Sequence, residues 1–63
     1  MLDIRWEEPF CAEGSACFRI GTDARGNAYI AVAGAEDAYV TDSREALRAL
    51  IHDIKAGKAD HLL

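Results

Sequence analysis

The spacing of apolar residues in this 63-residue chain changes once, near residue 42, and that change limits the folds available to it. Before residue 42, apolar residues alternate with polar or small ones, which is typical of strands with two distinct faces. After it, they recur at the spacing of a helix that buries one side. A short chain with this order of elements is predicted to form a single α+β domain, residues 1–63.

Four segments within residues 2–41 alternate in this way, and each is bounded by turn-forming residues. The predicted strands are Leu2–Trp6, Ala16–Ile20, Ala28–Ala33 and Ala38–Thr41. The turns between them contain Gly14-Ser15, Gly21–Asn27 and Gly34–Asp37. Short connections favour antiparallel neighbours, so we predict a small antiparallel meander of three or four strands.

One C-terminal helix is predicted at about residues 43–56, packed on one face of the sheet. Asp42 at the N-cap and Glu45 three residues later fit a capping box. Gly57 provides the left-handed residue that ends a helix. A single apolar stripe follows the helix and consists of Ala46, Leu47, Leu50, Ile51 and Ile54. We expect the short tail, residues 57–63, to fold back through Leu62 and Leu63.

Charge is distributed unevenly along the chain. Residues 1–43 hold eight acidic and three basic residues, whereas residues 44–63 hold three acidic and four basic ones. An acidic chain repels phosphates, so direct nucleic-acid binding is not expected. No apolar run approaches the roughly 20 residues of a membrane span, and the N-terminus does not resemble a secretory signal. We therefore expect a cytoplasmic protein without a membrane contact.

Cys11, Cys17, His52 and His61 are the residues suited to metal or redox chemistry. Reduced thiols are predicted because no export signal is seen, although the redox state of the cysteines stays open. Five residues separate the cysteines and eight separate the histidines, unlike a zinc finger. We predict no metal or cofactor, with a metal-binding module as a lesser alternative. His52 lies off the apolar stripe, near the helix C-terminus, where positive charge is favourable.

No catalytic residue is assigned, and the chain is predicted not to be an enzyme. The adjacent acids Glu7-Glu8 and Glu36-Asp37 point apart in a strand or turn, so they do not form a carboxylate pair. The glycine-containing loop Gly21–Gly26 leads into a strand rather than a helix N-terminus, so it is a hairpin loop rather than a phosphate site.

The aromatic residues favour contact with another protein chain. The predicted sheet carries bulky residues on both faces, and a single helix covers only one of them. We therefore predict a homo-oligomer, most simply a dimer, or docking on another protein. Trp6, Tyr29 and Tyr39 are the predicted interface residues, because tryptophan and tyrosine often anchor interfaces. A core position for Trp6 is the alternative.

The block Val40–Asp60 resembles the closing block of the BldB-like domain-of-unknown-function family of actinomycetes. Those small proteins end in a strand, a serine-led helix, an aliphatic stripe and Lys/Arg-Ala-Gly before an acidic stop. Trp6 and Cys17–Ile20 are similar to the family's N-terminal tryptophan and cysteine-led second strand. The chain departs from the family at three places, Gly34–Asp37, Ala46-Leu47 and Ala59. The family usually has Arg-Asp-Ser, Glu-Trp and an aromatic residue there.

The resemblance implies a non-enzymatic regulatory protein that partners a helix-turn-helix transcription regulator, sometimes in a toxin–antitoxin-like arrangement. An acidic inhibitor or toxin–antitoxin component that occupies a basic cleft of a target enzyme is the alternative function. The partner, the target gene and the choice between homotypic and heterotypic association stay open.

Overall fold

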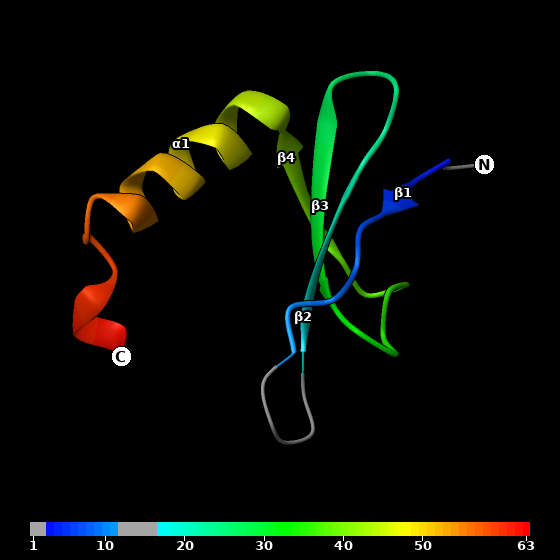
Figure 1. The fold of residues 1–63 in the computed structure, drawn as a ribbon. Coiled ribbons are helices and arrows are strands. Elements are labelled where there is room, and N and C mark those ends of the chain that lie inside the picture. Colours follow the sequence, from blue (N-terminus) through cyan, green and yellow to red (C-terminus); the bar gives the residue numbers. More distant parts are fainter. Residues whose placement is uncertain (1–2, 12–16) are drawn as a thin grey trace.

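The computed structural model describes residues 3–11 and 17–63. It contains four strands, one α-helix and a short 3-10 helix, in the order β1 Arg5–Trp6, β2 Phe18–Thr22, β3 Asn27–Val32, β4 Val40–Ser43, α1 Arg44–Lys55 and η1 Asp60–Leu62. The strands form one antiparallel sheet in the order β1-β2-β3-β4 (Figure 1). The predicted α+β meander with a C-terminal helix is confirmed. The predicted strand positions Leu2 and Ala16 and the Gly14-Ser15 turn lie outside the described residues.

The hairpin between β2 and β3 is tighter than predicted, because Gly21 and Thr22 continue β2. The turn starts at Asp23, whose N–H donates to the Asn27 carbonyl at 3.1 Å. The Asp23 carboxylate accepts the backbone N–H groups of Arg25 at 2.9 Å and Asn27 at 3.0 Å. Gly26 completes the turn with a φ of 88°, in the left-handed region that glycine tolerates best.

Helix α1 begins one residue later than predicted, with Ser43 rather than Asp42 as its N-cap. The Ser43 hydroxyl accepts the Ala46 N–H at 3.1 Å. Asp42 instead belongs to β4, where it pairs with Ala28 and its carboxylate accepts the Ser43 N–H. The residue three positions after the cap is then Ala46, so the predicted capping box does not form. The Arg44 N–H donates to the Gly26 carbonyl at 2.9 Å, which ties the helix start to the hairpin tip.

The helix ends at Gly57 as predicted. Gly57 has a φ of 88°. The Lys58 N–H donates to the Asp53 carbonyl at 3.0 Å, and the Gly57 N–H donates to the Ile54 carbonyl at 3.1 Å. This pair of hydrogen bonds is the Schellman motif. The expected fold-back of the tail is wrong, because Leu62 and Leu63 are exposed. The helix carries them away from the sheet (Figure 1).

A disulfide joins Cys11 to Cys17, which corrects the prediction of reduced thiols. The neighbouring residues pair as an antiparallel bridge, Phe10 with Phe18, and the Phe10 N–H donates to the Phe18 carbonyl at 2.8 Å. That bridge makes the cysteines the next facing pair, with Cα atoms 4.6 Å apart. The prediction rested on the expected compartment, whereas strand pairing is what brings the two sulfurs together.

The core of the described chain is small and lies on the central strand β3. Its buried apolar residues are Ala28, Tyr29 and Ala31, each at most 5% exposed. Of the twelve residues of α1, none is buried. The radius of gyration is 12.4 Å, compared with about 10.6 Å for a compact 63-residue domain. The molecule is therefore open rather than closed around a core.

Candidate functional site

Strand register assigns side chains to two faces of the sheet. Phe18, Ile20, Ile30, Val32 and Val40 share one face, which we call the apolar face. We call the other face the aromatic face. It carries one row of paired residues across the four strands, Trp6, Gly21, Tyr29 and Thr41. Helix α1 packs chiefly against β4 and β3. The two faces differ in how much of their apolar surface the chain itself covers.

The aromatic face is covered by its own side chains. The Tyr29 and Tyr39 rings meet edge to face with centroids 5.0 Å apart, and Trp6 lies 6.4 Å from Tyr29 on the other side. Such tilted pairs are the favourable arrangement of aromatic rings. Gly21 leaves the space into which Trp6 and Ile4 pack, since an added Cβ would lie within 2.8 Å of both.

This packing changes the expected roles of the three predicted interface residues. Tyr29 is only 3% exposed, so it is a core residue without the surface that an anchor needs. The expectation that Tyr29 needs cover from another chain is wrong, because Trp6 and Tyr39 cover it. Trp6 and Tyr39 are half-buried, so each still presents part of its ring to solvent.

Tyr29 of the aromatic face is hydrogen-bonded to Asp23 in the β2–β3 turn. The Tyr29 hydroxyl donates to the Asp23 carboxylate at 2.6 Å, and the Asn27 side-chain amide donates to the same oxygen at 3.1 Å. The hydrogen bond from Tyr29 and those from Asn27 and Arg25 hold the pKa of Asp23 well below its usual value. The same contact with Asp23 raises the pKa of Tyr29. These hydrogen bonds stabilise the β2–β3 hairpin.

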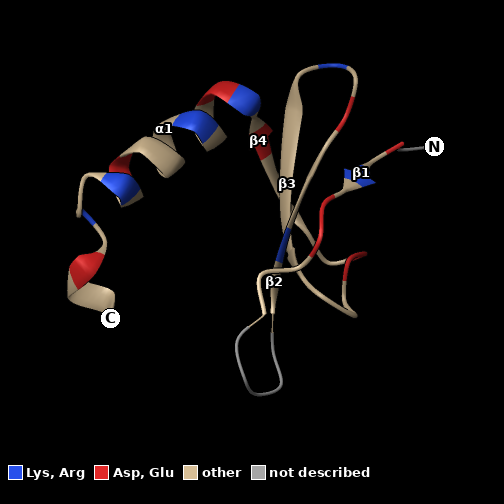
Figure 2. Ribbon diagram, in the orientation of Figure 1, with Lys and Arg blue, Asp and Glu red and all other residues tan. Residues whose placement is uncertain are grey.

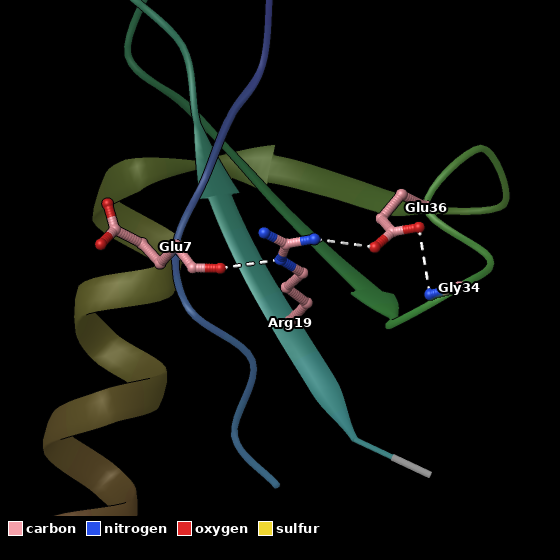
Figure 3. Close-up of polar contacts among 4 residues, drawn as sticks. All are labelled: Glu7, Arg19, Gly34 and Glu36. Carbon is pink, nitrogen blue, oxygen red and sulfur yellow. Dashed lines mark hydrogen bonds and ion pairs between the residues drawn. The ribbon is translucent and has the colours of Figure 1, made fainter.

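A second cluster of polar groups, centred on Arg19, links β2 to the segment after β1 and to the β3–β4 loop. The Arg19 guanidinium donates to the Glu7 carbonyl at 2.8 Å and to the Glu36 carboxylate at 2.9 Å (Figure 3). Glu36 also accepts the Gly34 N–H at 3.1 Å. The contact with Arg19 lowers the pKa of Glu36. These groups satisfy one another, so Glu36 is not half of a reactive carboxylate pair.

The apolar face is left open. Val40 and Phe18 are 66% and 65% exposed, and Val32 is also exposed. Phe10, which pairs with Phe18 at the edge of the sheet, is exposed as well. Side chains of this size are rarely exposed together on a small protein unless they meet another surface.

Helix α1 continues this apolar surface. Its N-terminal half forms a groove of about 320 Å³ with the sheet, in which Leu47 and Leu50 of the helix oppose Ile30 and Val40. Its C-terminal half diverges from the sheet (Figure 1). Leu50, Ile51 and Ile54 are 42–50% exposed. We call the apolar face and this helix stripe together the apolar surface.

A hollow of about 380 Å³ beside the β2–β3 hairpin is polar. Three arginines, Arg5, Arg25 and Arg44, lie around it together with Asp3 and Asp23. Both signs of charge are present, and the Asp23 carboxylate is already occupied by the hairpin. The hollow therefore presents charges of both signs rather than a cluster of one sign.

Charge separates the strand-and-loop part of the molecule from the helix. Acidic residues lie between β1 and β2 and on the β3–β4 loop, whereas α1 carries both signs (Figure 2). His52 is exposed on α1, and His61 lies in η1. Among residues 3–11 and 17–63, His, Cys, Asp and Glu side chains form no group of three that could hold a metal. In the same ranges, no helix is long and apolar enough to cross a membrane.

Comparison with known protein families, with curated proteins and with solved structures finds no match to this chain. The resemblance to the BldB-like family therefore stays a prediction from the C-terminal block.

Sequence reasoning missed the residues that make the apolar surface, Phe18, Val40, Leu50, Ile51 and Ile54. It assigned the helix stripe to the chain's own sheet and expected the aromatic residues to need a partner. A signal for the burial of Tyr29 was present, because aromatic rings that share one face of a sheet can pack against one another.

Proposed function

We propose that this protein is a non-enzymatic regulatory protein that acts by docking on another protein chain through its apolar surface. The observation that carries the proposal is the exposure of large apolar side chains on both parts of that surface, Phe18, Val32 and Val40 on the sheet and Leu50, Ile51 and Ile54 on the helix. Burial of such a surface is the main favourable term in protein association. The polar clusters around Asp23 and Arg19 are internally satisfied, so they support the fold rather than a reaction.

The proposed class of partner is a helix-turn-helix transcription regulator, as the BldB-like resemblance implies. An acidic protein suits a basic DNA-binding partner, because the opposite charges steer the encounter. The strand-and-loop part carries most of the acidic residues, so it is the part expected to face such a regulator.

The test is coexpression of the protein with a helix-turn-helix regulator encoded beside it, followed by co-purification. We expect a complex with the wild type that is lost in Leu50→Glu, since Leu50 lies in the groove and is 43% exposed. Ala49→Glu is the matched control, because Ala49 lies on the polar side of the same helix. Binding that survives Leu50→Glu would contradict docking through the apolar surface.

An acidic inhibitor that occupies a basic cleft is the second candidate, favoured by the acidic residues gathered on the strand-and-loop part (Figure 2). Ionic strength separates the two functions. A complex formed by exposed charges weakens steeply as salt is added, whereas a complex formed by the apolar surface does not. Steep loss of binding with salt, together with an unaffected Leu50→Glu variant, would favour the inhibitor.

A further inference from the structure

We infer that the apolar surface is occupied by a second copy of this chain, with the diverging half of each α1 seated on the open sheet of the other copy. This inference rests on the proposed function, that the apolar surface docks a protein chain, and it names the first occupant of that surface.

The exposed area of the chain is the first argument for a second copy. The accessible surface is 5228 Å², whereas a compact monomer of 6.9 kDa has about 4000 Å². The excess is about 1200 Å², and each partner of a standard interface contributes about 800 Å². One interface made by the apolar surface would therefore bring the chain close to the exposed area of an ordinary small protein.

The shape of the surface is the second argument. The sheet and α1 of one copy form a groove lined on the helix side by Ala46, Leu47 and Leu50, and the C-terminal half of α1 extends away from the sheet (Figure 1). Its two uncovered parts are the end of the sheet that carries Phe18 and Val32 and the half of the helix that carries Ile51 and Ile54. Under two-fold symmetry, the uncovered helix of each copy meets the uncovered sheet of the other, and both parts are buried at once.

Charge is the third argument. The strand part, residues 1–43, has five more acidic than basic residues, whereas residues 44–63 have one more basic than acidic residue. A two-fold arrangement that places helix on sheet brings the slightly positive part of one copy onto the negative part of the other. A helix-to-helix arrangement would lack this complementarity, and a sheet-to-sheet one would oppose like charges.

Dimer formation also leaves the opposite face of the sheet free. Trp6 and Tyr39 lie on that aromatic face, away from the helix, and each remains half-exposed. The regulator proposed above docks through the apolar surface, so it would compete with the second copy rather than use this face.

The first experiment is sedimentation velocity over a range of concentrations, with light scattering to give the mass. The expected mass is twice 6.9 kDa. Ile54→Glu should give a monomer with the wild-type helical circular dichroism, because Ile54 is 50% exposed and lies on the diverging half of α1. Ala49→Glu places the same charge on the polar side of the helix and should leave the dimer intact. A wild-type monomer at every concentration would overturn the inference.

A mixing experiment tests the seating of helix on sheet. Phe18→Glu and Ile54→Lys should each weaken the dimer by at least tenfold. A mixture of the two variants should recover a dimer, since it restores one natural contact and pairs Glu with Lys at the other. Dimers formed by the single variants, or no recovery in the mixture, would overturn this arrangement.

The two proposals fail separately. A monomer that still binds the regulator through Leu50 would overturn the second copy and keep the proposed function. A dimer that binds no regulator would keep the second copy and remove the proposed partner.

Discussion

At the scale of single residues, Asp23 has the largest influence on the hairpin. Its carboxylate accepts four hydrogen bonds, two from backbone N–H groups and two from the side chains of Asn27 and Tyr29. All four favour the ionised form, so the pKa of Asp23 is lower in the folded protein than in the unfolded chain. Ionisation of this single carboxylate is therefore linked to folding.

We expect the free energy of unfolding to decrease as the pH falls below about 5. The contribution of Asp23 is fully present above its unfolded pKa of about 3.9, and it is lost as the pH falls toward the lower folded pKa. Glu36, whose pKa is also lowered, adds to the same trend. Urea unfolding at a series of pH values measures the slope, which Asp23→Asn should flatten. Asp37→Asn removes the same charge at an exposed site and should leave the slope in place; equal slopes in all three proteins would contradict the assignment.

Gly21 is the other residue whose identity the packing dictates. A Cβ at this position would lie 2.7 Å from Ile4 Cγ2 and 2.8 Å from Trp6 Cε3. We expect Gly21→Ala to cost about 1–3 kcal/mol of stability, the usual cost of overpacking. In an Ile4→Ala background one of the two close atoms is absent, so the cost measured by urea unfolding should shrink. The same cost in both backgrounds would assign the effect to the backbone instead.

At the scale of elements, the alternating pattern predicted the faces of the strands better than their ends. β2 and β4 both begin and end two residues later than predicted, but side chains still alternate between the two faces in the predicted order. Their ends depend on contacts that a local pattern does not contain. The hydrogen bonds of Asp23 shorten the hairpin loop, and pairing of Asn27 with Ser43 extends β4 to the start of the helix.

The N-cap offers a test of that boundary. Ser43→Ala removes the acceptor for the Ala46 N–H and should cost about 1 kcal/mol of stability. Asp42→Ala removes a side chain that lies outside the first helical turn and should cost less. Thermal unfolding followed by circular dichroism compares the two variants. A larger loss of stability in Asp42→Ala than in Ser43→Ala would indicate that Asp42 is the N-cap, as the sequence predicts.

The disulfide contributes at the same scale, because it fixes the Phe10–Phe18 bridge at the edge of the sheet. Its cysteines are six positions apart, and closing so short a loop stabilises a fold by about 2 kcal/mol in the chain-entropy account. We expect the Cys11→Ser/Cys17→Ser variant to lose about this much stability. Added reductant should lower the stability of the wild type by a similar amount and leave the stability of the variant unchanged. A reductant effect on the variant would point to another cause.

At the scale of the whole molecule, the sequence predicted that the chain leaves apolar side chains of its sheet uncovered, but it did not predict that these are aliphatic residues and Phe18 rather than Tyr29. An amphipathic helix has the same stripe whether that stripe covers its own sheet or another chain. The angle at which α1 leaves β4 decides between these outcomes, and that angle is set by tertiary contacts such as the Arg44–Gly26 hydrogen bond. The aromatic residues closed over one another for the same reason, since β3 brings Tyr29 between Trp6 and Tyr39.

If two copies share the apolar surface, association is linked to folding and stabilises the folded chain. The apparent melting temperature should then rise with protein concentration, because mass action favours the dimer. Differential scanning calorimetry at several concentrations measures this rise. The Ile54→Glu variant should melt at a lower temperature that does not depend on concentration. A concentration-independent wild type would show that the small core on β3 is stable by itself.

The disulfide also changes the covalent connectivity of the molecule. Residues 11–17 form a closed ring, so the chain can be cut once inside that ring without being divided into two molecules. A protease that cleaves there would add the mass of one water, and reduction would then release an N-terminal peptide containing Trp6. Mass spectrometry before and after reduction would therefore report where a cut lies, inside the ring or elsewhere in the chain.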